Sequence, residues 1–215
     1  MESEDPNAVW IMQGWLFSYS DFWQEPQIKA ILSGAPQGSM IILDLDSTHR
    51  EQYSRTQGYF GLQPFIFNDL SNFGGGLGLF GRLDNINQRP FEARKFNMIG
   101  TGFTPEGLTD SYISTELMSE MSWRQVPVAN QTFWIQQYLE RRYGIHNQEA
   151  LQAWSILAKH VLNSNTDHFN QKVLLTLIPN LDRTDFTWYP FSEVVEAFDW
   201  MVLAVPELQH EPGFQ

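Results

Sequence analysis

The chain has 215 residues, of which 42% are hydrophobic and 14% aromatic, so it carries enough apolar material for one or two packed cores. Its formal charge of -12 excludes a basic surface for nucleic acid, and the absence of cysteine excludes disulfides, cysteine-ligated zinc and a thiol nucleophile. The sequence contains no apolar stretch of about 18 residues and shows no secretory signal at its N-terminus.

Four short apolar runs in the first 126 residues have the character of buried parallel strands. They are continuously apolar rather than alternating, and they lie near turn sequences that contain Gly and Pro. The predicted strands are residues 8–15, 40–45, 64–70 and 97–102. Stretches such as 26–33 and 79–96 lie between them at spacings that suit βαβ units. Since four such units are half of an eight-stranded barrel, we predict an α/β fold that is a partial (β/α)8 TIM-type barrel.

The chain changes character after Pro127. Apolar residues then recur at helical spacing, which predicts an all-α region with an aromatic core. The predicted helices are residues 132–144, 150–162 and 192–205. We place the boundary in the PVANQT segment, residues 127–132. Within that segment Asn130 begins an Asn-x-Thr sequon, which is an acceptor for N-glycosylation if the protein is secreted.

A glycine-rich segment at residues 74–81 contains the spacing of a dinucleotide-binding turn. The pattern is Gly76-x-Gly78-x-x-Gly81, soon after a predicted strand. A nucleotide site would also need an acid at the end of the next strand to bind a ribose, and the run 97–102 has none. We therefore favour a glycine-rich loop between a strand and a helix.

A second motif, Asp44-x-Asp46-x-Thr48, directly follows an apolar strand. It resembles the first motif of haloacid-dehalogenase phosphatases, in which one aspartate attacks phosphorus and a second binds magnesium. The downstream acids that would complete this site are limited to Asp182 and Asp185 in the helical part. In the alternative interpretation, Asp44 points into a polar pocket and Asp46 is solvated.

Aromatic, polar and acidic residues gather at the carboxyl ends of the predicted strands. They are Trp15, Asp44, Leu45, Asn72, Phe73 and Glu106. In a β/α barrel these ends converge on the active site. An aromatic wall stacks on a pyranose and a carboxylate can attack its anomeric carbon, which together predict a sugar site. From the residues alone an equal alternative is that Glu106 is a loop carboxylate that stabilises the start of a helix within 109–121.

The order of several segments resembles the lysosomal-type α-N-acetylglucosaminidases of glycoside hydrolase family 89, over nearly the whole chain. The segments are QGWLF, ILDL, QPFIFNDLSNFGG and IGTGFTPEG, followed by LMSEMSWR, YLERRYG and TWYPFSEVVEAF. The resemblance implies a retaining exo-hydrolase that removes terminal α-linked N-acetylglucosamine from heparan sulfate-type glycans, with no metal or organic cofactor. It also implies that Glu106, in a Pro-Glu-Gly motif, is the nucleophile and that Trp15, Leu45 and Phe73 line the sugar pocket.

Two departures qualify what the resemblance implies. Phe67, Asn68, Ser71 and Gly76 replace the residues usual in the third segment, which bears on substrate preference. Retaining hydrolysis also needs a second carboxylic acid about 5 to 5.5 Å from the nucleophile. The resemblance places that acid in an Asn-Glu motif upstream of QGWLF, and the chain contains no such motif.

We therefore expect residues 1–126 to form the C-terminal half of a catalytic barrel, and 127–215 to form the start of an α-helical C-terminal domain. Because the chain has no such general acid, we expect it to be inactive in isolation. A half barrel leaves its outer strands unpaired, so we also expect the isolated chain to associate through its sheet edges. For the full-length protein the resemblance implies a glycan partner and a lysosomal or secreted location, and it leaves self-association open. Two other functions stay open: a sugar-binding or inert remnant without catalysis, and the magnesium-dependent phosphatase.

Overall fold

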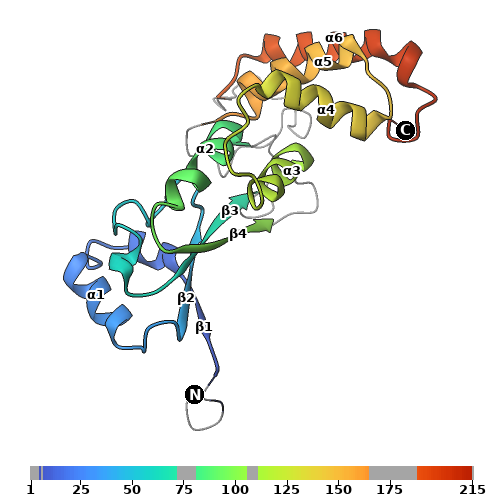
Figure 1. The fold of residues 1–215 in the computed structure, drawn as a ribbon. Helices are drawn as coiled ribbons and strands as arrows, with labels where there is room; N and C mark the ends of the chain where they lie inside the picture. The colour runs from blue at the N-terminus through green and yellow to red at the C-terminus, as the bar shows by residue number, and fades with distance from the viewer. Residues whose placement is uncertain (1–4, 6, 72–80, 106–110, 165–187, 215) are drawn as a thin grey trace.

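One parallel sheet of four strands organises the first part of the molecule. The computed structural model describes residues 5, 7–71, 81–105, 111–164 and 188–214. The strands are β1 (Trp10–Gln13), β2 (Met40–Leu45), β3 (Phe65–Ser71) and β4 (Met98–Pro105). They lie in chain order, each parallel to the next (Figure 1). The predicted α/β fold with parallel strands is confirmed.

Helices and short turns connect the strands. They are the 3-10 turn η1 (Gly14–Ser18), α1 (Glu25–Ser33), the 3-10 turn η2 (Tyr59–Gly61), α2 (Leu83–Ala93) and α3 (Tyr112–Met121). β1 is shorter than the predicted run 8–15 because the chain turns into η1 directly after Gln13. Pro26 lies in the first turn of α1, where its missing N–H costs no helical hydrogen bond.

The last part of the chain is helical, as predicted. It comprises α4 (Gln131–Tyr143), α5 (Gln148–Ile156), the π-turn η4 (Leu157–Val161) and α6 (Phe191–Leu208), which we call the helical region. Two asparagines cap these helices: Asn130 Oδ1 accepts from the Phe133 N–H at 3.0 Å and Asn147 Oδ1 from the Ala150 N–H at 2.7 Å. The exposed Asn130 of the sequon is thus the N-cap of α4.

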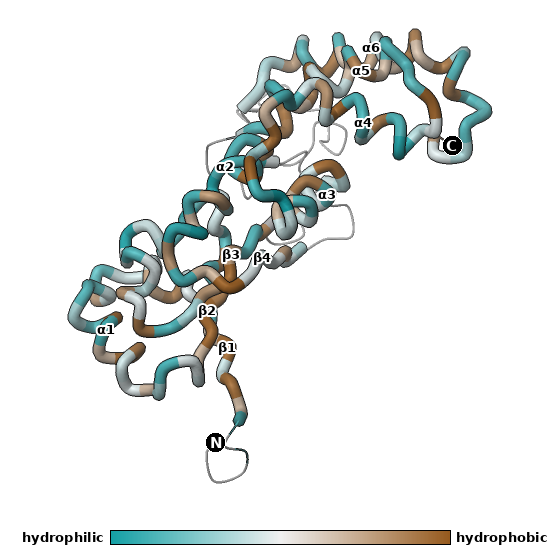
Figure 2. The backbone as a smooth tube through the Cα atoms, in the orientation of Figure 1, coloured by the Kyte–Doolittle hydropathy of each residue, from teal (hydrophilic) through white to brown (hydrophobic). Residues whose placement is uncertain are grey.

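The core lies against one face of the sheet. Met40, Ile42 and Phe65 are buried there together with Ile28 and Leu32 of α1. β1 and β2 are hydrophobic along the backbone trace (Figure 2). Among the described residues β1 pairs only with β2 and β4 only with β3, so both edges of the sheet are open.

The strands point toward the rest of the molecule. In Figure 1 the arrowheads of β3 and β4 are directed toward α3, and the helical region lies beyond them. The carboxyl ends of the strands therefore lie on the side of the sheet nearest the helical region. No helix in the described part of the chain has the length and apolar character that crossing a membrane requires.

Candidate functional site

Two of the predicted pocket residues, Trp15 and Leu45, lie at the carboxyl ends of neighbouring strands. Trp15 lies in η1, is 36% exposed, and donates from its indole N–H to Oε1 of Gln13. Gln13 is aligned with Leu43 in the β1–β2 register, and Leu45, two residues further along β2, is 9% exposed. A partly exposed indole ring is thus available at the carboxyl end of β1, whereas Leu45 is buried at the end of β2.

β3 and β4 end at paired residues, on the side of the sheet where all four strands have their carboxyl ends. Ser71, the last residue of β3, is aligned with Pro105, the last residue of β4. The predicted site residues Asn72, Phe73 and Glu106 lie outside the described residues. The two segments that carry them nevertheless leave the sheet from paired positions on adjacent strands.

A side-chain hydrogen bond connects β3 and β4 near these strand ends. The buried Asn68 donates from Nδ2 to Oγ1 of Thr104 at 2.9 Å. A Cβ atom at Gly102 would lie 2.4 Å from Asn68 Oδ1, so only glycine fits beside the amide. Asn68, one of the departures from the family sequence pattern, thus has a structural role in the strand pair.

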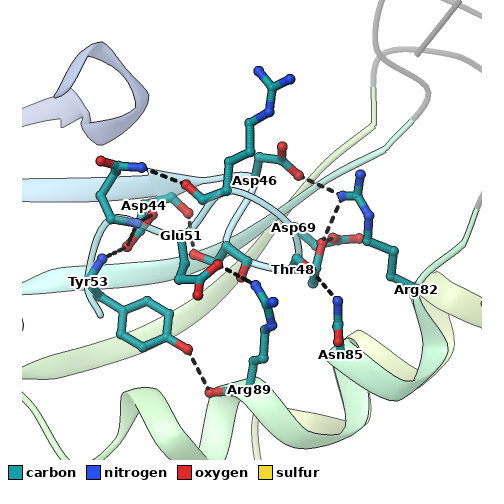
Figure 3. Close-up of polar contacts among 12 residues, drawn as sticks. Asp44, Asp46, Thr48, Glu51, Tyr53, Asp69, Arg82, Asn85 and Arg89 are labelled. Carbon is teal, nitrogen blue, oxygen red and sulfur yellow. Dashed lines mark hydrogen bonds and ion pairs between the residues drawn. The ribbon is translucent and has the colours of Figure 1, made fainter. Parts of the chain in front are cut away.

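Asp44 is fully buried at the end of β2. Its carboxylate accepts hydrogen bonds from the backbone N–H groups of Gln52, at 3.0 and 3.1 Å, and Tyr53, at 2.6 Å (Figure 3). Desolvation by burial raises the pKa of Asp44 to about 7, although the two backbone hydrogen bonds act in the opposite direction. With no exposed surface, Asp44 organises the loop that follows β2.

A left-handed turn brings Tyr59 to Asp44. Four successive residues, 57–60, have positive φ angles between 47° and 68°, a conformation that is unfavourable for every residue but glycine. The buried Tyr59 hydroxyl approaches the Asp44 carboxylate and lowers its pKa, although no hydrogen bond of normal geometry forms between them. Burial raises the pKa of Tyr59 itself well above its ordinary value.

Asp46 forms a buried ion pair, so the interpretation of Asp46 as solvated is wrong. Its Oδ1 lies 2.8 Å from Nη1 of Arg82, and the two side chains are 7% and 2% exposed (Figure 3). Desolvation raises the pKa of Asp46 to about 7, and the charge of Arg82 offsets part of this rise. Asp46 itself has a φ angle of 66°.

The ion pair continues into β3 through Thr48. The Thr48 hydroxyl donates to Oδ1 of Asp69, and Arg82 Nη1 lies 3.5 Å from Thr48 Oγ1. Asp46, Thr48, Asp69 and Arg82, which we call the Arg82 network, therefore join the carboxyl ends of β2 and β3 to the start of α2. Buried polar contacts of this kind hold the elements that they join in one arrangement.

The phosphatase motif finds little support among the described residues, and most of the nucleotide motif lies outside them. The described residues contain no cluster of three His, Asp or Glu side chains that could hold a metal ion. Asp182 and Asp185, as well as Gly76 and Gly78, lie outside the described residues. The carboxylates of Asp44 and Asp46 contact protein donors instead.

Sequence patterns gave no sign of Arg82 or Tyr59. An arginine is rarely buried, and a tyrosine in a left-handed turn is rarer still, so neither position matches a motif. The one available signal was that Arg82 directly follows the glycine-rich sequence of residues 74–81.

Sequence comparisons identify related proteins for both parts of the chain. Residues 1–125 match the profile of the alpha-N-acetylglucosaminidase (NAGLU) tim-barrel domain, and residues 134–215 match that of the alpha-N-acetylglucosaminidase C-terminal domain. The chain is 37% identical to human alpha-N-acetylglucosaminidase over 221 residues, which cover all of this chain. It spans 30% of the length of that relative.

Solved structures of a family 89 glycoside hydrolase from Clostridium perfringens share the fold. The complex of that enzyme with PUGNAc superposes with a TM-score of 0.81 at 26% identity, and covers 99% of this chain and 24% of the other. The complex with its substrate GlcNAc-alpha-1,4-galactose gives a TM-score of 0.79 at 25% identity, with the same coverage.

Proposed function

The chain belongs to the alpha-N-acetylglucosaminidase family, and on that premise we propose that it supplies the nucleophile half of a retaining exo-glycosidase active site. The substrate is a terminal α-linked N-acetylglucosamine of a heparan sulfate-type glycan. Glu106 is the nucleophile, and Trp15, Leu45, Asn72 and Phe73 line the sugar pocket. The protein acts in the lysosome or after secretion, where Asn130 is open to glycosylation.

The observation that carries the proposal is the common direction of the four parallel strands, whose carboxyl ends lie on one side of the sheet. Trp15 and Leu45 lie at the carboxyl ends of β1 and β2, and the segments of Phe73 and Glu106 start from the paired ends of β3 and β4. A sugar ring needs an aromatic wall beside a carboxylate; in this proposal Trp15 contributes to the wall and Glu106, which follows β4 in the sequence, is the carboxylate.

The chain by itself lacks part of the chemistry. Retaining hydrolysis needs a second carboxylic acid that protonates the leaving oxygen. The Asn-Glu motif that supplies this acid in the family does not occur among the 215 residues. We therefore propose that the isolated chain does not turn over substrate, and that activity needs the N-terminal part of the family fold.

Hydrolysis of an aryl α-N-acetylglucosaminide tests the proposal. The protein to assay contains these 215 residues joined to the N-terminal part of the family fold. We expect turnover by this protein, and a loss of several orders of magnitude in kcat for Glu106→Gln, which keeps the shape of the side chain but removes the nucleophile.

The matched control is Glu116→Gln, because Glu116 of α3 forms a solvent-exposed ion pair with Arg141 of α4. We expect this variant to keep its kcat. A mild effect of Glu106→Gln, similar to that of the control, would remove Glu106 from the nucleophile role.

A further inference from the structure

The helical region contacts the sheet region through a short β-bridge. Arg82 and Asn163 form an isolated antiparallel bridge, in which the Ser164 N–H donates to the Gly81 carbonyl at 2.9 Å and the Leu83 N–H to the Leu162 carbonyl at 3.3 Å. A Cβ atom at Gly81 would lie 2.6 Å from the Leu162 carbonyl oxygen, so the bridge requires glycine there. The backbone on both sides of Arg82 is thus held from the end of η4.

Side chains reinforce this bridge at the start of α2. Asn163 accepts from the Asp84 N–H at 3.1 Å and donates to Asp84 Oδ2 at 2.6 Å. Gln131, the first residue of α4, donates to the other carboxylate oxygen of Asp84 at 2.7 Å. Two elements of the helical region therefore contact one acidic residue, two positions after Arg82.

The side chain of Arg82 extends from the bridge to the candidate site. Its guanidinium contacts Asp46, just beyond β2, and Thr48, which donates to Asp69 near the end of β3 (Figure 3). With 2% of its surface exposed, Arg82 is too buried to serve as a surface charge. One residue thus connects the helical region with the strand ends that carry Leu45 and lead to Asn72 and Phe73.

We propose that Arg82 is a positioning residue, through which the helical region sets the carboxyl ends of β2 and β3 for sugar binding. This inference rests on the proposed function, because it concerns the same edge of the sheet. Arg82 does not touch the substrate. The bridge fixes its backbone, and its guanidinium fixes the Asp46 turn and, through Thr48, the end of β3. Through Arg82 the helical region therefore contributes to substrate affinity.

Three variants test the proposal. Asn163→Ala removes the side chain that fixes Asp84 but leaves the Arg82 network itself intact. Arg82→Lys keeps the positive charge opposite Asp46, yet a lysine cannot reproduce the planar fork of a guanidinium. Gln148→Ala is the matched control, because Gln148 is an exposed residue of α5 in the same helical region.

The first measurement is steady-state hydrolysis of the aryl α-N-acetylglucosaminide by the protein that includes the N-terminal part of the family fold. A loosened pocket edge weakens binding of substrate and transition state alike, so we expect Asn163→Ala and Arg82→Lys to raise KM by about tenfold with little change in kcat. The control should keep both constants. An unchanged KM in Asn163→Ala and Arg82→Lys, even with a lowered melting temperature, would overturn the proposal.

The second measurement, amide hydrogen exchange on the 215-residue chain, does not depend on catalysis. The N–H groups of His49 and Arg50 donate to the Asp46 carbonyl at 3.0 and 2.8 Å, so their exchange reports on the Asp46 turn. We expect Asn163→Ala to speed their exchange by roughly tenfold. If His49 and Arg50 exchange equally fast in Asn163→Ala and in Gln148→Ala, the coupling between the helical region and the Asp46 turn is refuted. If the unsubstituted protein does not hydrolyse the substrate, the proposed function is refuted, but the exchange experiment still tests the coupling.

Discussion

Replacing Asp44 with asparagine should change how the stability of the protein depends on pH. The folded protein buries this carboxyl group completely and surrounds it with two backbone N–H donors and the Tyr59 hydroxyl. Both N–H groups lie within 3.1 Å of Oδ2, so one oxygen of a neutral group can accept both hydrogen bonds. An asparagine at this position would therefore imitate the protonated aspartic acid, which is why we choose Asp44→Asn.

The magnitude follows from the pKa of Asp44, which burial raises from 3.8 to about 7. At ~1.4 kcal/mol for each pKa unit, this difference corresponds to about 4 kcal/mol of unfolding free energy. Because the folded-state pKa lies above the unfolded one, the folded protein binds the proton more tightly. The stabilisation is complete below pH 3.8 and is lost as the pH rises through about 7.

Urea unfolding followed by tryptophan fluorescence, in steps from about pH 4 to pH 8, measures this effect. We expect the parent chain to lose about 4 kcal/mol more than Asp44→Asn across this range, since the other titrating groups are common to both proteins. Asp21→Asn, at an exposed position, should follow the parent curve. Parallel curves for the parent and Asp44→Asn would show that Asp44 titrates alike in both states, and the reasoning from burial would fail.

Two further predictions concern packing and sheet edges. Asn87→Ala removes the side chain that donates to the Val128 carbonyl at 3.0 Å and accepts from the Val128 N–H at 2.7 Å. Because this leaves two buried backbone groups unpaired, we expect urea titration to show a loss of about 2 to 5 kcal/mol in the unfolding free energy. An unchanged urea midpoint would contradict this prediction. The edge strands β1 and β4 carry Ile11 and Ile99, each 57% exposed. We therefore expect the apparent mass of the isolated chain in size-exclusion chromatography to increase with concentration. A monomer at all concentrations would contradict association through these edges.

The strands and helices could be predicted because their signals are local. A continuous apolar run such as 40–45 can be satisfied only by burial on both faces, and the structure has β2 at the same residues. The helical stripe of Trp134 and Tyr138 in α4 is likewise buried as predicted. Boundaries were less predictable: β4 continues to Pro105 because its partner β3 continues to Ser71, and a pairing of this kind is not visible in one strand alone.

The Arg82 network could not be predicted because its members are far apart in sequence. Asp46 and Arg82 are separated by 36 positions, and their contact depends on the turn after β2 and on the bridge that holds the chain at Gly81. An isolated aspartate after a strand is normally solvated, because burying its charge costs free energy. Only the fold reveals that an arginine offsets that cost.

The two faces of the sheet explain why neighbouring acidic and aromatic residues have different roles. Successive side chains of a strand point to opposite faces, so Asp44 shares the core face with Ile42 and Leu45 points the other way. Gly14, the first residue of η1 directly after β1, lies on the core face, because a Cβ there would lie 2.9 Å from Ile42 Cγ2.

On β1, Met12 is buried and Gln13 is exposed, so Gln13 points away from the core, and its side chain accepts the hydrogen bond from the Trp15 indole. The run MIILDL is apolar on both sides of the strand apart from Asp44, so its sequence does not show which side faces the core. Once these contacts fix the assignment, the acid near the end of β2 on the core face has a raised pKa and organises a loop, while Trp15, which is 36% exposed, remains available to a ligand.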